Sequence, residues 1–188
     1  MNSALTLHPD YLCTKNPTMK KLLLPALLLF SMFTLTHCKK DASGISSVTV
    51  RLKDATASYD HVYVEVTGVE IHSNETGWVQ VPVQDSIYDL LTLQNNASVV
   101  LGNQQFPAGT ISQVRLILGS RDSVVVSGVS YPLTLSSEDE SGLKLDVHQQ
   151  AVAGVNYILL LDFIVSQSIV ETGSNKYKLK PVITASFQ

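Results

Sequence analysis

Two pairs of possible metal ligands have the two-residue spacing of one face of a β-strand. Glu70 and His72 form the first pair, and Asp146 and His148 form the second. Alternate residues of a strand point to the same face, so each pair presents a carboxylate and an imidazole together. On neighbouring strands these four side chains could hold zinc or a similar ion. The alternative, which we favour, is that they cover the polar outer faces of ordinary strands, so we expect no metal and no other cofactor.

Arg115 lies within the apolar run VRLIL. A charge with apolar neighbours on a strand either faces outward or pairs with an acid. We predict a structural ion pair between Arg115 and Asp162, rather than a ligand-binding arginine.

Aromatic side chains offer a second kind of site. Trp78 and Tyr88 could stack against a sugar, because an aromatic ring combines an apolar face with a polar group at its edge. The same residues could instead seal the core of a β-sandwich, which is the more common use of Trp and Tyr.

Catalytic patterns are missing from the sequence. There is no Gly-rich phosphate loop and no GxSxG, and the three histidines after Cys38 have no matched nucleophile. Asp54, Asp60 and Asp89 could bind calcium at strand ends, but capping of nearby turn amides explains them more simply. We therefore expect no catalytic residues and no enzymatic activity.

The segments that contain these residues have the sequence pattern of β-strands. Apolar and polar residues alternate with a period of two, and no helical periodicity of useful length follows Cys38. Gly68 permits a bulge, and hairpin turns are expected at 74–77 and 127–128. We predict an all-β, antiparallel β-sandwich of immunoglobulin-like or transthyretin-like type, with 155–165 central and Pro181 at an edge or a bulge of the last strand. The expected strands are 47–53, 61–72, 78–83, 111–119, 123–127, 128–135, 143–148, 155–165 and 177–187, with 87–93 either a short strand or a helical turn.

Composition excludes several classes of protein. Of 13 basic and 16 acidic residues, three lysines and Asp10 precede Cys38, which leaves 10 basic and 15 acidic residues. This acidic balance argues against a nucleic-acid partner. The 150 residues after Cys38 contain no cysteine. Disulfides, thiol redox chemistry and cysteine-ligated zinc are therefore excluded there.

Residues 19–37 have the pattern of a lipoprotein signal peptide. Lys20 and Lys21 precede a 14-residue apolar run, Leu22 to Leu35, which is shorter than the roughly 20 residues that span a bilayer. The run ends at Cys38, which resembles the lipidated cysteine of a lipobox. His37 departs from the usual small residue, and the ending LTHC followed by KK resembles lipoproteins of the Bacteroidetes group. An uncleaved anchor, or a secreted protein with an incidental cysteine, is the alternative.

The chain thus divides into four parts. We expect translation to start at Met19, which makes 1–18 an extension that is mis-started or disordered. The signal peptide covers 19–37, a polar tether covers 38–44, and a β-sandwich domain covers 45–188. The expected location is outside the cytoplasm, at the outer membrane, with the protein held to the membrane by lipid on Cys38.

Many short motifs occur together in a recognisable order. They are VRLKDATASYDHVYVEVTGVEIHS, GWVQV, YDLLTL, PAGTISQVRLILG, SGLKLDV, LDF, SIV, TG and YKLKPVI. Together they resemble the bacterial and archaeal domain of unknown function 4382 over about residues 45–184. The resemblance implies an exported, often lipid-anchored, all-β sandwich and no established activity. Where members commonly carry a second acid after LDF, this chain has Ile164.

These features favour a cell-envelope lipoprotein with a non-catalytic binding or structural module. Its expected partners are the membrane, through the lipid, and a glycan or another envelope protein. Two alternatives remain open: a metal-dependent or hydrolytic enzyme of the envelope, and a structural subunit of a surface assembly. A structural subunit of a surface assembly would present an exposed apolar strand edge for strand addition.

Overall fold

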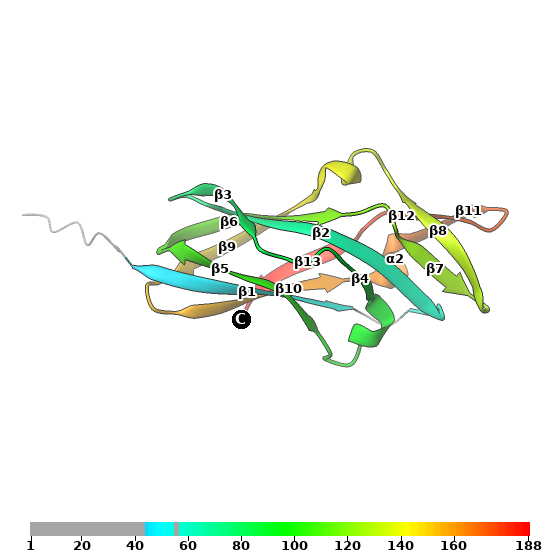
Figure 1. Cartoon of the computed structure of the whole chain (residues 1–188), viewed down its shortest axis with the longest axis horizontal. Coiled ribbons are helices and arrows are strands. Elements are labelled where there is room, and N and C mark those ends of the chain that lie inside the picture. The colour runs from blue at the N-terminus through cyan, green and yellow to red at the C-terminus, as the bar shows by residue number, and fades with distance from the viewer. Residues whose placement is uncertain (1–43, 55–56) are drawn as a thin grey trace, which may run out of the picture. The chain divides into compact units, whose positions relative to one another are not determined.

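The computed structural model describes residues 44–54 and 57–188. The predicted extension, signal peptide, Cys38 and most of the tether lie outside the described residues. Figure 1 shows the strands and short helices of the described part. They are β1 (Ile45–Asp54), β2 (His61–Ser73), β3 (Gly77–Val81), β4 (Ser86–Asp89), η1 (Leu90–Leu93), β5 (Val99–Pro107), β6 (Gly109–Leu118), β7 (Ser123–Val126), β8 (Val129–Leu135), η2 (Asp139–Ser141), β9 (Leu143–Ala151), β10 (Asn156–Phe163), α2 (Val165–Ser168), β11 (Ile169–Gly173), β12 (Lys176–Leu179) and β13 (Ile183–Phe187).

The strands form because alternate residues are apolar and β-branched, which suits a pleated surface with one face buried. In β1, the buried side chains are those of Val48, Val50 and Leu52. In β10, Leu159, Leu161 and Phe163 are buried in the same alternating way.

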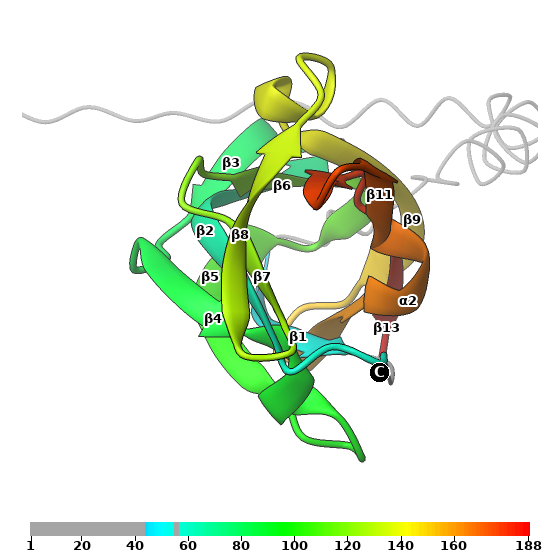
Figure 2. The ribbon, with the colours of Figure 1, turned by 90° about the vertical axis from the view of Figure 1, so that its right-hand side faces the viewer.

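The strands assemble into two sheets. One sheet has the order β13-β10-β1-β5. The other has the order β11-β12-β8-β7-β2-β6-β9, and β3 and β4 pair with β2 outside that path. The apolar faces of both sheets contribute to one core cluster, which includes Val50, Leu161, Ile71 and Leu116. In Figure 2, β6 and β1 lie on opposite sides of the described body. An all-β sandwich-like fold is thereby confirmed.

The strand directions correct one part of the prediction. β1 pairs with β10 in parallel, and β12 pairs with β8 in parallel. The sheets are therefore mixed, whereas the sequence suggested purely antiparallel ones. Alternation with a period of two is the same for both directions, so it could not distinguish them.

Most of the local predictions are confirmed. The register of β2 shifts between Val66 and Gly68, as the expected bulge requires. β2–β3 and β7–β8 are the two expected hairpins. Segment 87–93, expected to be either a short strand or a helical turn, contains both, because strand β4 leads into the 3-10 helix η1. β10 lies between β13 and β1, which is the central place predicted for 155–165.

The last predicted strand is wrong as a single element. Segment 177–187 is divided into β12 and β13, which belong to different sheets. Pro181 lies between them, where its missing N–H costs no ladder hydrogen bond. Within residues 44–54 and 57–188, no helix has the length and hydropathy needed to cross a membrane.

Candidate binding surface

The outer face of β3, β2, β6 and β9 carries two rows of polar side chains that cross the strands. We call this surface the Trp78 face. Its first row is Gln80, Glu70, Arg115 and Lys144, and its second is Trp78, His72, Gln113 and Asp146. The rows face outward because the intervening residues of each strand, such as Val69, Ile71 and Val114, are buried in the core.

Trp78 is the centre of this surface. Its side chain is 36% exposed, and it is not part of the core cluster. The Arg115 guanidinium carbon lies 4.2 Å from the centroid of the indole, a cation–π contact. The His72 ring meets the indole edge-on, with 5.2 Å between centroids. Two neighbours from β2 and β6 therefore fix the orientation of this half-exposed ring.

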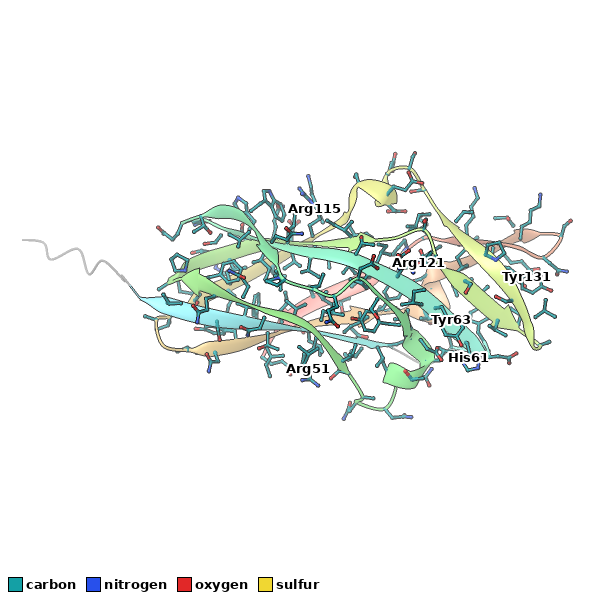
Figure 3. All side chains as sticks on the ribbon, viewed as in Figure 1. Arg51, His61, Tyr63, Arg115, Arg121 and Tyr131 are labelled. Carbon is teal, nitrogen blue, oxygen red and sulfur yellow. The ribbon has the colours of Figure 1, made fainter. Side chains whose placement is uncertain are left out.

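Arg115 is in an ion pair, but not with the predicted partner. Its Nη1 lies 2.5 Å from Oε2 of Glu70 on the adjacent strand. Asp162 belongs to the other sheet and pairs with Lys53 at 2.6 Å. The predicted Arg115–Asp162 pair is wrong because the β2–β6 register places Glu70 directly opposite Arg115. Figure 3 shows Arg115 and Arg51, a neighbour of Lys53 in β1, on opposite sides of the described body.

The four candidate metal ligands share the Trp78 face without meeting. Glu70 and His72 lie on β2, Asp146 and His148 lie on β9, and β6 separates the two strands. The amide of Gln113 on β6 donates to Asp146 at 2.7 Å, and Glu70 is engaged by Arg115. The condition for the metal hypothesis, two neighbouring strands, is not met. The described part of the chain also gathers no group of three or more ligand side chains suited to a metal ion.

Tyr88 is not part of the Trp78 face. It stands opposite Val64 on β2, which is fully buried, and its ring packs against the core. Trp78 instead stands opposite the outward-facing His72. Of the two aromatic residues considered for either stacking or core packing, Tyr88 therefore packs against the core and Trp78 lies at the surface.

The aspartates at strand ends act as caps. Asp89 accepts a hydrogen bond from the Leu91 N–H at the start of η1. Asp60 accepts one from the Gly128 N–H, and Asp54 accepts one from the Val165 N–H. The local capping that the sequence suggested is thus confirmed for Asp89, whereas Asp60 and Asp54 accept from amides 68 and 111 residues further along the chain.

A second polar cluster was missed by the sequence analysis. Glu65 is buried, and its carboxylate accepts hydrogen bonds from the backbone N–H groups of Ser120 and Arg121 and from Arg121 Nε. Gly119 is required there, because a Cβ at this position would lie 2.0 Å from Glu65 Oε2. Asp122, also buried, accepts from the Glu65 N–H at 2.8 Å. The only sequence signal was the turn GSRD after a strong strand, which does not identify Glu65 as its partner.

The two carboxyls of this cluster titrate in opposite directions. Hydrogen bonds from the side chain and backbone of Arg121 lower the pKa of Glu65 from 4.5 to about 2. Burial raises the pKa of Asp122 from 3.8 to about 6. Opposed shifts can mark an acid and a base in catalysis. Here, however, donors of the 119–122 turn occupy the Glu65 carboxylate, so we interpret the pair as a structural anchor for residues 119–122.

The surface hollows do not coincide with the predicted site residues. One of about 410 Å³ is lined by Leu118, Leu133, Leu135 and Glu140, among others. Another, of about 370 Å³, lies over the four-stranded sheet beside Arg51, Lys53 and Leu160. Neither lining combines an acid with a histidine.

Fold and surface together define an all-β sandwich whose most distinctive feature is a held, half-exposed tryptophan on a polar sheet face. Residues 45–181 match the profile of the family described as Domain of unknown function (DUF4382), and the chain belongs to this family. Comparison with curated proteins finds no match, and comparison with solved structures finds none either.

Proposed function

We propose that the protein is a lipoprotein of the cell envelope whose sandwich domain binds saccharide through the Trp78 face without catalysing a reaction. The observation that carries this proposal is the held, half-exposed Trp78 among hydrogen-bonding side chains. The proposed location is the outer membrane, through acylation of Cys38 at the end of the apolar run.

The chemistry of the face suits a sugar ring. The C–H groups of a pyranose form an apolar patch that packs on an indole, and its hydroxyls exchange hydrogen bonds with nearby polar groups. Gln80, Gln113 and His72 provide donors and acceptors around Trp78. Because Arg115 and His72 already hold the indole, little side-chain entropy is lost when a ligand stacks on it.

The test is direct binding with a single substitution. Lipidated protein is screened on an array of neutral and acidic oligosaccharides, and the strongest ligand is titrated by calorimetry. We expect affinity in about the micromolar to millimolar range, because one exposed ring on an open face provides limited contact. Trp78→Ala should weaken binding at least tenfold, which corresponds to about 1.4 kcal/mol.

A matched control is Ile87→Ala. Ile87 is 41% exposed on β4, which pairs with the same strand β2. This variant should bind as the unsubstituted protein does. Binding by Trp78→Ala at full affinity, or no saccharide bound at all, would contradict the proposal.

The alternatives have their own readouts in the same experiment. Cleavage of the bound oligosaccharide, or stoichiometric metal in the purified protein, would favour an envelope enzyme. Co-purification of one envelope protein from cross-linked cells, without saccharide binding, would favour a structural subunit of a surface assembly.

A further inference from the structure

An exposed apolar connection joins β9 to β10. Residues 151–155 read Ala-Val-Ala-Gly-Val, and every residue after Ala151 is exposed. Surface connections normally carry polar side chains, since they face water. A connection of this length without one polar side chain therefore suggests a partner that is itself apolar.

Backbone hydrogen bonds hold this connection against the first three residues of β1. The Gly154 N–H donates to the Ile45 carbonyl at 2.8 Å, and the Ser47 N–H donates to the Val155 carbonyl at 3.2 Å. Ile45 is 60% exposed, Val152 53% and Val155 40%. We call these three residues the basal patch. In Figure 1, the start of β1 and the connection between β9 and β10 lie at the same end of the described body.

The patch lies close along the chain to Cys38. Seven peptide units separate Cys38 from Ile45, and an extended chain spans at most about 25 Å over that number. If Cys38 carries acyl chains, as the proposed function requires, the membrane surface lies within this distance of Ile45. Lys39, Lys40 and Asp41 lie within the intervening segment, which gives it a net charge of +1, and this sign suits anionic headgroups.

We propose that the basal patch docks on the lipid bilayer, with the Ile45, Val152 and Val155 side chains entering the boundary between headgroups and acyl chains. A second copy of the chain fits less well. Three aliphatic side chains offer a few hundred Å² at most, well below the roughly 1,200 Å² of a stable interface. Glu75, in the β2–β3 turn beside Gly109, is a charged residue at this end, and it would stay in the headgroup region.

Docking would fix the orientation of the domain on its lipid anchor. The β7–β8 and β11–β12 turns lie at the end of the described body opposite the patch (Figure 1). That end would therefore point away from the bilayer. The Trp78 face, on the outer side of β3, β2, β6 and β9, would stay accessible to saccharide.

The absence of cysteine after Cys38 allows a clean experiment. Val152→Cys gives one free thiol in the lipidated protein, which is labelled with an environment-sensitive fluorophore. Val129→Cys is the matched control, because Val129 is 52% exposed at the start of β8, next to the opposite end. Both proteins are reconstituted in vesicles of phosphatidylethanolamine and phosphatidylglycerol and compared with the same proteins in detergent-free buffer containing no vesicles.

On vesicles, we expect the label at position 152 to shift its emission to shorter wavelength and to become protected from iodide quenching. The label at position 129 should do neither. Equal quenching at both positions would overturn docking, and so would a shift that appears only at high protein-to-lipid ratio, which would indicate contact between copies. Intact mass separates the two failures. Acylated protein with a water-exposed label overturns docking alone, whereas protein without acyl chains overturns the anchoring on which docking and the proposed function both depend.

Discussion

Arg115 contacts two side chains at once, because its guanidinium pairs with the Glu70 carboxylate and lies over the ring of Trp78. Arg115→Ala should leave Glu70 without this partner and free the indole. We expect a loss of about 1 kcal/mol in the free energy of unfolding. Trp78 is the one tryptophan of the chain, so intrinsic fluorescence reports on it alone, and its emission should shift to longer wavelength.

The control for this substitution is Arg51→Ala, on the opposite side of the described body (Figure 3). It removes a guanidinium that is bonded to Ser98, far from the indole. Its fluorescence should match that of the unsubstituted protein. An unchanged spectrum for Arg115→Ala would mean that the cation–π contact does not hold the ring in solution.

Asp122 should make stability depend on pH in a defined direction. Its pKa in the folded state, about 6, lies above its ordinary value of 3.8. The folded state therefore holds this proton more tightly than the unfolded state does. The resulting stabilisation is complete below about pH 3.8 and is lost as the pH rises through about 6.

Asp122→Asn removes this titration while keeping an oxygen for the Glu65 N–H. The stability of the variant relative to the unsubstituted protein should therefore improve between pH 4 and pH 7, by roughly 1 to 2 kcal/mol after solvent screening. Urea unfolding at several pH values measures the difference. Exposed Glu140→Gln is the control, and a pH-independent difference for Asp122→Asn would show that burial does not raise this pKa.

Glu65 contributes in the opposite direction. Its pKa of about 2 lies below its ordinary 4.5, so its stabilisation is present above about pH 4.5 and is lost as the pH falls towards 2. The two carboxyls thus change the free energy of unfolding in different pH ranges. Of the two, only Asp122 changes it between pH 4.5 and 7.

At the level of elements, the β7–β8 hairpin has a two-residue turn with positive φ at both positions, 50° at Ser127 and 76° at Gly128. This is the type I′ geometry for which Asn-Gly is the preferred sequence. Ser127→Asn should stabilise the fold by a few tenths of a kcal/mol, and Gly128→Ala should destabilise it by about 1 kcal/mol. Thermal unfolding checks both, and a destabilising Ser127→Asn would contradict the turn assignment.

Elements were predictable where alternation was clear, but β5 and β11 are absent from the expected strands. Alternation located β1, β2, β6 and β9, and turn residues located both hairpins. Partners distant in sequence were not predictable. Glu70 faces Arg115 only because β2 pairs with β6, a pairing set by burial of both strands in the core. The division of 177–187 into two strands was not predictable either, because it depends on β12 and β13 pairing with strands of different sheets.

The residues of the candidate site were also predictable one by one, but not their contacts with residues distant in sequence. Trp78, Glu70, His72 and Arg115 were each singled out from the sequence, but as members of three separate hypotheses. Their common location depends on three strands lying side by side in one sheet. The Glu65 cluster was invisible because its donors are mostly backbone N–H groups, which every sequence supplies.

For the described body as a whole, the β1–β10 pairing should determine cooperativity. Both strands are interior to their sheet and supply fully buried core residues, including Val50 and Leu159. Their amide hydrogens should exchange only through global unfolding, whereas those of β11 at the end of the larger sheet should exchange sooner. Hydrogen exchange followed by mass spectrometry tests this, and earlier exchange in β1 than in β11 would contradict it.

The parallel partner of β1 is a strand that begins more than a hundred residues later, and β1 also needs β5 on its other side. A chain emerging amino end first, from a ribosome or through a translocation pore, cannot complete the pairing of β1 until β10 has followed. Folding of this sheet is thereby postponed until β10 has been synthesised. A polypeptide of this topology keeps its four-stranded sheet unformed while the more than one hundred residues between β1 and β10 are made.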